Sequence, residues 1–324
     1  MPVAVVTGAT GQDGSYLCEA LVERGWRVHA VVRDVDRGAL PLPADVEFHA
    51  GDLLDPEGLA ETILTTEPDA IFNLAGITSV AESWRQPGLT ASVTGSAVAS
   101  ILDAAFRLQE TLGRRVAVLQ PSSAEIFGEP TTTPQDESTP IRPTSPYGAA
   151  KAFAHDLVRI YRDRGLSASS VILFNHESPR RSTAFVTRKI TRTVAQIAAG
   201  QAETLTLGAL DAVRDWGWAP DYVDAMIRVA TAPEASDFVV ATGVSHSVRD
   251  FAEAAFRAAG IDDWSRRIRI DEALIRPADP HEMRGDASKI GAELGWRPTV
   301  GFDELVARMV EHDLALISAG EVTA

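Results

Sequence analysis

Four polar side chains suited to acid–base chemistry occur in one short stretch of the chain. Ser123 and Glu125 follow the apolar run VAVL, and Tyr147 and Lys151 occur together in the segment SPYGAAK. Residues four positions apart share one face of a helix, so the phenol and the ammonium can lie side by side. Because a nearby cation favours the phenolate and lowers its pKa, this spacing predicts a tyrosine that acts as a general base.

Two elements must position these side chains. The apolar run at 116–119 is typical of a buried parallel strand, and Ser145 and Pro146 mark the start of a helix. The hydroxyl and the carboxylate would then lie at the carboxyl end of the strand, facing the phenol and the ammonium on the helix. The proline- and threonine-rich segment 129–144 is predicted to be a loop at the mouth of this cleft.

A second motif occupies the N-terminus. A short strand, VAVV, runs into the turn TGATGQDG and then into an amphipathic helix. Glycines allow a tight turn and a close approach to a pyrophosphate, which is bound by the free N–H groups of the helix. The motif predicts a dinucleotide site formed by Gly8, Gly11, Gln12, Asp13 and Gly14.

Later strands add candidates to the dinucleotide site. The second strand ends in Arg33-Asp34, where an arginine suits a ribose 2′-phosphate and an acidic group suits a 2′-hydroxyl. Arg33 favours NADP and Asp34 favours NAD; we predict NADP, with NAD as the alternative. Further contacts to the dinucleotide are expected from the ends of the third and fourth strands, at Asp52, Leu53, Leu74 and Ala75.

The order of these elements predicts an α/β fold. Strands alternate with helical patterns over residues 1–175, which indicates a doubly wound parallel sheet of the Rossmann type. The alternation loosens over 176–324, which is predicted to be a smaller α/β lobe for the substrate, with some later segments returning to the first domain.

Composition narrows the class of protein. The 324 residues carry a net charge of −15, which argues against a general nucleic-acid binder. Cys18 is the only cysteine, so an intrachain disulfide is impossible and a reducing compartment is expected. The sequence indicates neither a signal peptide nor a membrane partner, and we predict a cytoplasmic protein. His176 has no partners at metal-ligand spacing, so a hydrogen-bonding role is expected there and no metal site is predicted.

Together the motifs resemble the extended short-chain dehydrogenase/reductase superfamily and, within it, the GDP-mannose 4,6-dehydratase family. The resemblance runs nearly end to end. It is carried by TGATGQDGSYL at 7–17, SPYGAAK at 145–151, LFNHESPRRSTAFVTRKI at 173–190, RDWGWAPDYVDAM at 214–226 and ATGVSHSVRDF at 241–251.

The resemblance implies a reaction and a role for each matched residue. A nucleotide-activated hexose would be oxidised at C4 with Tyr147, Lys151 and Ser123, would lose water across C5–C6 with Glu125 as the base, and would regain hydride at C6. His176 and Arg181 would contact the cofactor, and a homodimer is expected. The positions expected to bind the nucleotide sugar are Thr78, Ser123, Asn175, Lys189, Arg214 and Arg276.

Two kinds of alternative remain open. The chain could be a nucleotide-sugar epimerase or a dehydratase of another nucleotide sugar, since Ile77, Ala124 and Phe127 make the sugar end of the expected pocket less polar than is usual in the family. Glu125 favours dehydration, because a 4-epimerase needs no carboxylate at C5. A non-catalytic cofactor sensor is a remote alternative, since such a protein would be expected to lose Tyr147 or Lys151.

Overall fold

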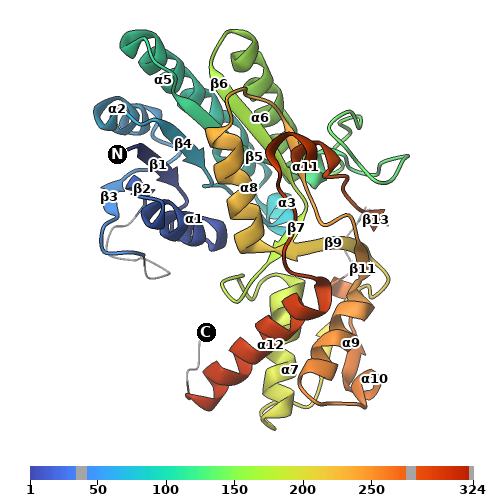
Figure 1. Cartoon of the computed structure of the whole chain (residues 1–324). Coiled ribbons are helices and arrows are strands. Elements are labelled where there is room, and N and C mark those ends of the chain that lie inside the picture. The colour runs from blue at the N-terminus through green and yellow to red at the C-terminus, as the bar shows by residue number, and fades with distance from the viewer. Residues whose placement is uncertain (34–41, 275–281, 321–324) are drawn as a thin grey trace.

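The computed structural model describes residues 1–33, 42–274 and 282–320. Its centre is a parallel sheet of seven strands in the order β10-β6-β5-β4-β1-β2-β3 (Figure 1). The predicted doubly wound α/β fold is thereby confirmed. The strands are β1 (Val3–Thr7), β2 (Arg27–Val32), β3 (Glu47–Ala50), β4 (Ala70–Asn73), β5 (Ala117–Ser123), β6 (Ser167–Leu173) and β10 (Phe238–Val240).

The strand order creates a crevice at the carboxyl edge of the sheet. The chain moves outward from β1 to β2 and β3, then returns to the other side of β1 to form β4. Loops after β1 and β4 therefore leave in opposite directions, and in open α/β sheets ligands bind at this switch point. Both predicted motifs lie at this edge, since the glycine turn follows β1 and Ser123 ends β5.

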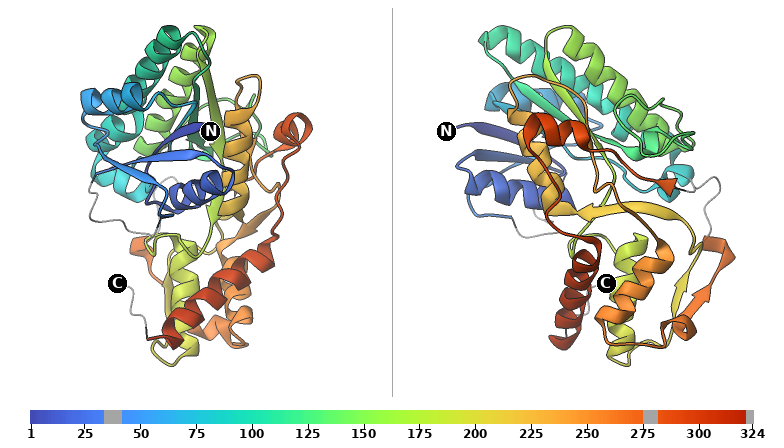
Figure 2. Two further views of the ribbon diagram at one scale, coloured as in Figure 1. Left: turned by 60° about the vertical axis from the view of Figure 1, so that its left-hand side comes forward. Right: turned by 45° about the vertical axis from the view of Figure 1, so that its right-hand side comes forward.

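Helices cover both faces of the sheet (Figure 2). On one face Leu17 and Leu21 of α1 (Gln12–Glu23) share a core with Met226 of α8 (Ala219–Thr231). On the other face the core joins Ile63, Ile101 and other apolar side chains from three helices, α2 (Pro56–Thr66), α5 (Ala97–Leu112) and α6 (Pro146–Asp163). Two elements from the second half of the chain thus return to the first sheet: β10 forms its edge strand, and α8 packs on its face.

One helical run is unusually long. The short helix α4 (Pro87–Thr90), the π-helix η1 (Ala91–Ser96) and α5 join into one helix over Pro87–Leu112. Its length and composition alone would allow it to cross a membrane, but half of its apolar window is buried in the protein. A core helix passes the same test, and its packing against α2 and α6 accounts for its apolar character.

A smaller group of elements packs below the carboxyl edge of the sheet around its own core (Figure 1). In this core Trp216 meets Ile190, Phe251 and Met309, which are all nearly fully buried. The group consists of α7 (Val186–Ala198), α9 (Val248–Ala258), α12 (Phe302–Ser318), β7 (Asn175–Glu177), β8 (Leu205–Leu207), β9 (Val213–Trp218), β11 (Ser245–Ser247), β12 (Ile268–Ile270) and β13 (Glu282–Met283).

Short helical segments complete the described chain: α3 (Val80–Arg85), η2 (Ala124–Ile126), α10 (Trp264–Arg267), η3 (Glu272–Leu274) and α11 (Ser288–Leu294). Strand β5 is longer than the apolar run that predicted it and includes Ser122 and Ser123. Ser123 therefore has extended backbone and points from the last position of the strand, directly before the turn that carries Glu125.

Candidate active site

The glycine turn after β1 has the tight geometry that its spacing predicts. Gly8 has a φ of +68°, and a Cβ there would lie 2.7 Å from the backbone nitrogen of Ala75. A Cβ on Gly14 would lie 2.1 Å from the carbonyl oxygen of Gly8. Gly11 is exposed at the start of α1, where no side chain caps the helix. The free N–H groups of this helix end fit the diphosphate of a dinucleotide.

A line of buried polar side chains crosses the central strands behind this turn. The hydroxyl of Thr7 donates to Asn73 Oδ1 at 2.7 Å, and Asn73 Nδ2 donates to Gln120 Oε1 at 2.7 Å. Thr7 Oγ1 also accepts the N–H of Ala75 at 3.1 Å. These residues hold the carboxyl ends of β1, β4 and β5 in register. Sequence reasoning missed all three, although a polar residue next to an apolar strand is a usable signal.

The loop after β4 is held from a second direction. Thr94, in the π-helix η1, accepts the N–H of Ile77 at 3.0 Å. A π-turn in a helix is often found at functional sites, and here it aims one hydroxyl at the loop. Leu74 donates its N–H to the carbonyl of Thr7 at 3.2 Å, while Thr78 is exposed at the open end of the loop.

Close backbone packing joins the two halves of the predicted catalytic set. Ser123 Oγ accepts the N–H of Glu125 at 3.2 Å and so caps η2. A Cβ on Gly148 would lie 2.5 Å from the carbonyl oxygen of Glu125, so only glycine lets α6 approach η2 this closely. Ser145 caps α6 by accepting the N–H of Gly148 at 3.0 Å. Gly148 is therefore a structural requirement of the site that sequence reasoning missed.

Tyr147 and Lys151 lie on one helix face, but the predicted effect of the lysine on the tyrosine pKa is wrong. Burial raises the pKa of Tyr147 to about 12, against a hydrogen bond from Ser123 that lowers it. Lys151 Nζ lies 5.9 Å from the centre of the tyrosine ring and donates to the carbonyl of Pro121 at 2.8 Å. Its ammonium is directed at the backbone of β5, and burial lowers the pKa of Lys151 to about 8.

Arg181 is the cation that acts on the phenol. After burial and the Ser123 hydrogen bond, the charges that influence the pKa of Tyr147 are those of Glu125 and Asp13, which raise it, and that of Arg181, which lowers it. Arg181 is fixed by an ion pair with Glu177, 3.3 Å from Nε to Oε2. The structure thus brings Arg181, which was expected only to contact the cofactor, together with Ser123, Glu125 and Tyr147.

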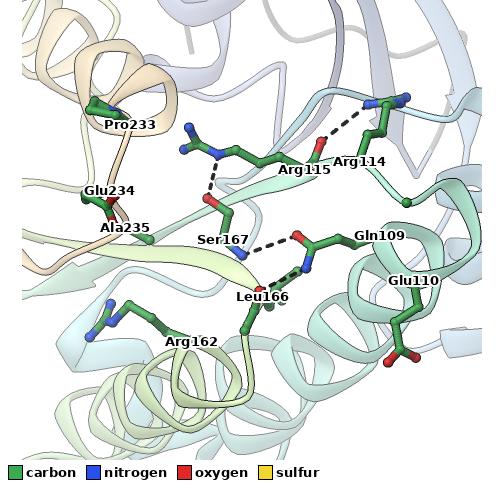
Figure 3. Close-up of a pocket in the computed structure, with 12 residues that line it drawn as sticks. Gln109, Glu110, Arg114, Arg115, Arg162, Leu166, Ser167, Pro233, Glu234 and Ala235 are labelled. Carbon is green, nitrogen blue, oxygen red and sulfur yellow. Dashed lines mark hydrogen bonds between the residues drawn. The ribbon is translucent and has the colours of Figure 1, made fainter.

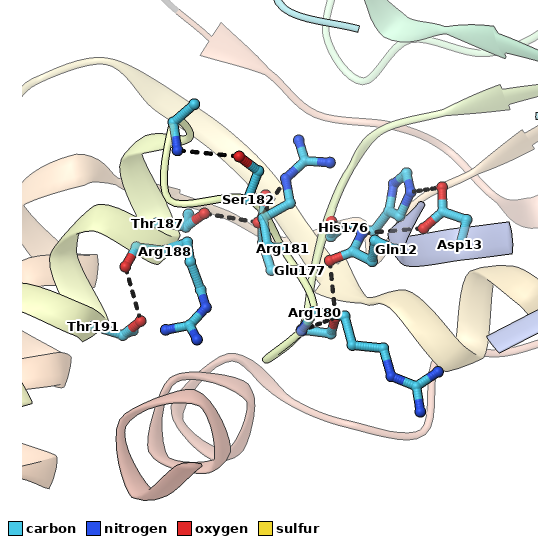
Figure 4. Close-up of polar contacts among 12 residues, drawn as sticks. Gln12, Asp13, His176, Glu177, Arg180, Arg181, Ser182, Thr187, Arg188 and Thr191 are labelled. Atoms are coloured by element: carbon cyan, nitrogen blue, oxygen red, sulfur yellow. Dashed lines mark hydrogen bonds and ion pairs between the residues drawn. The ribbon is translucent and has the colours of Figure 1, made fainter. Parts of the chain in front are cut away.

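A polar network ties β7 to the first turn of α1 (Figure 4). His176 Nε2 lies 2.8 Å from Asp13 Oδ2, and its Nδ1 lies 2.8 Å from the carbonyl of Phe174. Burial opposes charge on the imidazole, but the Asp13 carboxylate outweighs it and raises the pKa of His176. Burial likewise opposes charge on Asp13, and His176 outweighs it and lowers the pKa of Asp13. Gln12 links the same two elements by donating to the carbonyl of His176 at 3.1 Å.

Arg180 extends this network along α1. Its two terminal nitrogens lie 3.0 and 2.7 Å from the two carboxylate oxygens of Glu19, and the first also donates to Ser15 Oγ at 3.0 Å. The guanidinium stacks on the ring of Tyr16 at 3.9 Å. Sequence reasoning singled out neither Arg180 nor Glu19 because they are 161 residues apart.

The other predicted residues lie around the same edge of the sheet or in the smaller group of elements. Arg33 follows β2 and is exposed, and Asp52 and Leu53 follow β3. Asn175 pairs with Trp216 between β7 and β9. Lys189 is partly exposed in the first turn of α7, and Arg214 is buried in β9. Asp34 and Arg276 lie outside the described residues.

Two expectations about the sugar pocket are corrected. Phe127 is 1% exposed and packs against Phe174, with the ring centres 6.5 Å apart. Ala124 is 2% exposed in the same core cluster. Both side chains fill the space between β5, β6 and α6, so their apolar character serves packing and does not make the sugar end less polar. Ile77 remains partly exposed in the loop after β4.

The chain also has an open hollow of about 600 Å³ at the opposite, amino edge of the sheet (Figure 3). It is lined by Arg115, Arg162 and Ser167, but each arginine is already engaged. Arg162 forms an ion pair with Asp237 at 2.6 Å, and Arg115 donates to Ser167 Oγ at 2.7 Å. The predicted site residues lie at the other edge, so the hollow is not part of the candidate active site.

Comparison with known proteins agrees with this geometry. A family model described as GDP-mannose 4,6 dehydratase matches residues 5–309. The chain is 41% identical to GDP-mannose 4,6 dehydratase 1 of Arabidopsis thaliana, over 99% of this chain and 92% of the relative.

Solved structures share the fold over nearly the whole chain. A UDP-glucose 4-epimerase of Thermus thermophilus in complex with NAD has a TM-score of 0.82 at 28% identity, covering 96% of this chain and 98% of the other. The structure of RMD from Pseudomonas aeruginosa complexed with NADPH has a TM-score of 0.81 at 25% identity, covering 97% and 99%. With a family model spanning most of its length and a relative at 41% identity, the chain belongs to the GDP-mannose 4,6-dehydratase family.

Proposed function

We propose that this chain is a lyase that dehydrates GDP-mannose to GDP-4-keto-6-deoxymannose. The observation that carries the proposal is the packing of η2 on α6, which holds Glu125 next to Tyr147. A base for C5 and a base for the 4-hydroxyl are both needed for dehydration. Family membership supports the choice of substrate, since the 41% identical relative has this activity in its name.

A tightly bound nicotinamide cofactor is part of the proposal. The Gly8–Gly14 turn and the uncapped start of α1 fit its diphosphate. A nicotinamide held there would supply a reversible hydride acceptor for C4 and C6 of the sugar, so no outside oxidant would be consumed. Arg33 supports NADP because a guanidinium suits a 2′-phosphate, and NAD is the alternative.

The residues of the chain move the protons. Tyr147 takes the proton of the 4-hydroxyl as C4 becomes a ketone, and Ser123 hydrogen-bonds the 4-oxygen. Arg181 favours the charged phenol, while Lys151, held on the Pro121 carbonyl, orders the helix face behind it. The ketone acidifies the proton on C5, Glu125 removes it, and the same carboxyl group passes this proton to the departing C6 hydroxyl, which leaves as water. The proton that Tyr147 took from the 4-hydroxyl is delivered to C5 as C6 regains the hydride, which completes the product.

The nucleotide end of the substrate is assigned to the smaller group of elements. Lys189 lies in the first turn of α7, a helix whose start has no side-chain cap, so both its ammonium and the free N–H groups suit a diphosphate. Arg214 adds a guanidinium from β9, and Asn175 supplies an amide from β7. These groups supply local positive charge and hydrogen bonds within an acidic chain.

A nucleotide-sugar epimerase is the second candidate, because an epimerase shares this fold. The test is mass spectrometry of the protein incubated with GDP-mannose and with other nucleotide sugars, together with Glu125→Gln and the exposed neighbour Glu129→Gln as a control. Loss of one water from GDP-mannose is expected for the wild type and for the control, and a loss of rate of about 10²–10⁴ for Glu125→Gln.

The same variant separates the two candidate reactions. If Glu125→Gln keeps full dehydration, Glu125 is not the C5 base and the proposed mechanism is wrong. If the wild type converts its sugar without loss of water, the protein is an epimerase. Water loss only from another nucleotide sugar would retain the mechanism and change the substrate.

We also propose a cytoplasmic homodimer. Phe153 and Ile160 of α6 are 50% and 44% exposed, which is unusual for large apolar side chains on a central helix. The neighbouring helical run Pro87–Leu112 adds further apolar surface. Sedimentation analysis of the wild type and of Phe153→Glu would test the dimer, which should dissociate in the variant.

A further inference from the structure

Three potential metal ligands share one face of the sheet at its β3 side. Strands β2 and β3 are parallel, with His29 opposite Glu47 and Val31 opposite His49. Because side chains at alternate positions of a strand point to the same face, all three polar side chains project to the same side. This face is the one that α2 and α5 cover further inward, as the burial of Val31 with Ile63 shows.

The distances between the ligand atoms are close to those of a metal site. One ligand atom of each residue lies within 4.8 Å of the other two. His29 Nδ1 is 2.8 Å from His49 Nε2 and 3.7 Å from Glu47 Oε2. Ligands of a tetrahedral zinc ion lie about 3.3 Å apart, given metal–ligand bonds of roughly 2.0–2.2 Å. Small side-chain rotations that lengthen the His29–His49 distance and shorten the His29–Glu47 distance would therefore reach this geometry.

Burial and charge also suit a cation. His29 is 4% exposed, so the surrounding protein holds its imidazole in place, and an imidazole nitrogen is a common zinc ligand. Glu47 brings the negative charge and is half-exposed, so an ion has a path from solvent. Arg27 competes for the carboxylate at 2.8 Å, but both partners of this pair are about half-exposed, and exposed ion pairs are weak.

We propose that His29, Glu47 and His49 form a binding site for a divalent transition-metal ion, zinc first, through two imidazoles and one carboxylate. Nothing in the proposed dehydration uses these residues. The ion would cross-link β2 to β3 at the side of the sheet where both strands lead to Arg33 and Gly51, the expected adenosine end of the cofactor site. Sequence reasoning predicted no metal site because the register between two separate strands creates this one.

The test is isothermal titration calorimetry of zinc chloride into the full chain after treatment with a chelator. His49→Gln and Glu47→Gln each remove one ligand, and His312→Gln removes an exposed histidine on α12 as a matched control. One zinc per chain is expected in the wild type and the control, with affinity at least about tenfold weaker in either ligand variant. Arg27→Gln should bind roughly two- to fivefold more tightly, because it releases Glu47 from its ion pair.

A second readout guards against a variant that merely misfolds. Cobalt(II) bound in the wild type should show the visible absorption of a four-coordinate nitrogen and oxygen site, and the metal-free variants should keep the circular dichroism of the wild type. Equal zinc affinity in the wild type and the ligand variants would overturn the proposal, as would no binding to the wild type at micromolar zinc.

Discussion

The buried ammonium of Lys151 leads to a testable pH dependence of stability. Burial lowers its pKa from 10.5 to about 8. Between these two values the unfolded chain carries the proton and the folded chain does not, so the free energy of unfolding rises as the pH rises through this range. Below pH 8 both states are protonated, and the cost of burying the ammonium is fully present. Lys151→Met removes the titrating group. The free energy of unfolding of the wild type should therefore rise relative to that of the variant by roughly 2.5 kcal/mol between pH 7 and pH 10.

The direction follows because the unfolded chain holds more protons than the folded one between pH 8 and pH 10.5, so the wild type gains stability relative to Lys151→Met as the pH rises. The comparison isolates the lysine from the other changes that the substitution makes. The lost hydrogen bond to Pro121 and the altered packing shift the variant curve by a similar amount at every pH. Tyr147, whose raised pKa makes stability fall at high pH, remains in both proteins. Lys289→Met, which removes a partly exposed lysine outside the candidate site, is the control variant.

Denaturation in urea, followed by circular dichroism at half-unit pH steps, measures the three curves. In thermal melts the same difference corresponds to a change of about 4 °C in Tm between the ends of the range. Parallel curves for the wild type and Lys151→Met would refute the reasoning, because they would mean that the ammonium is as well solvated in the folded chain as in the unfolded one. Lys151→Met should also lack dehydratase activity.

Two further predictions concern the network on α1. Arg180→Gln should destabilise the protein by about 1–2 kcal/mol in urea denaturation, because the partly buried Glu19 loses two hydrogen bonds to a charged partner. The control is Arg228→Gln, which removes an exposed ion pair with Asp224 and should cost at most about 0.5 kcal/mol. Equal losses of stability in the two variants would contradict the role assigned to Arg180. Asp13→Asn should destabilise the protein most between pH 3.8 and 6.5, where the lowered pKa of Asp13 and the raised pKa of His176 keep both charged. Stability from the pair should fall below this window as Asp13 takes up a proton and above it as His176 releases one, and a pH-independent effect in the same denaturation assay would exclude the ion pair.

The elements of the candidate active site are predictable because most of their signals are local. Gly8 is specified by its positive φ and Gly14 by its contact with Gly8, six residues away, whereas Tyr147 and Lys151 are specified by helix periodicity. The apolar run before Ser123 identified β5, although the strand extends further than the run. In each case chain neighbours determine the geometry, so a single sequence is sufficient to infer it.

What sequence reasoning missed depends on contacts between distant segments. The direction of the Lys151 ammonium is set by the carbonyl of Pro121 on another element, and this contact holds the charge 5.9 Å from the centre of the Tyr147 ring. The family resemblance predicts Phe127 at the sugar end of the pocket, but its packing against Phe174 of a different segment places it in the core. The hydrogen bond between Thr94 and Ile77 requires a π-turn for which the sequence carries no strong local signal.

The network on α1 has a consequence for the reaction itself. In the proposed reaction the same cofactor would exchange hydride with C4 and later with C6 of one sugar. The sugar and the dinucleotide would then have to keep their relative positions through both steps, and small displacements are costly in rate. The dinucleotide is expected at the start of α1 and the nucleotide end of the sugar at the elements that follow β7. Asp13 with His176, Gln12 with the His176 carbonyl and Glu19 with Arg180 join these two regions over nearly two turns of one helix. A single ion pair could act as a hinge, whereas three contacts along a rigid helix restrain both translation and rotation. The arrangement therefore favours a reaction in which the cofactor is reduced and reoxidised without leaving the site.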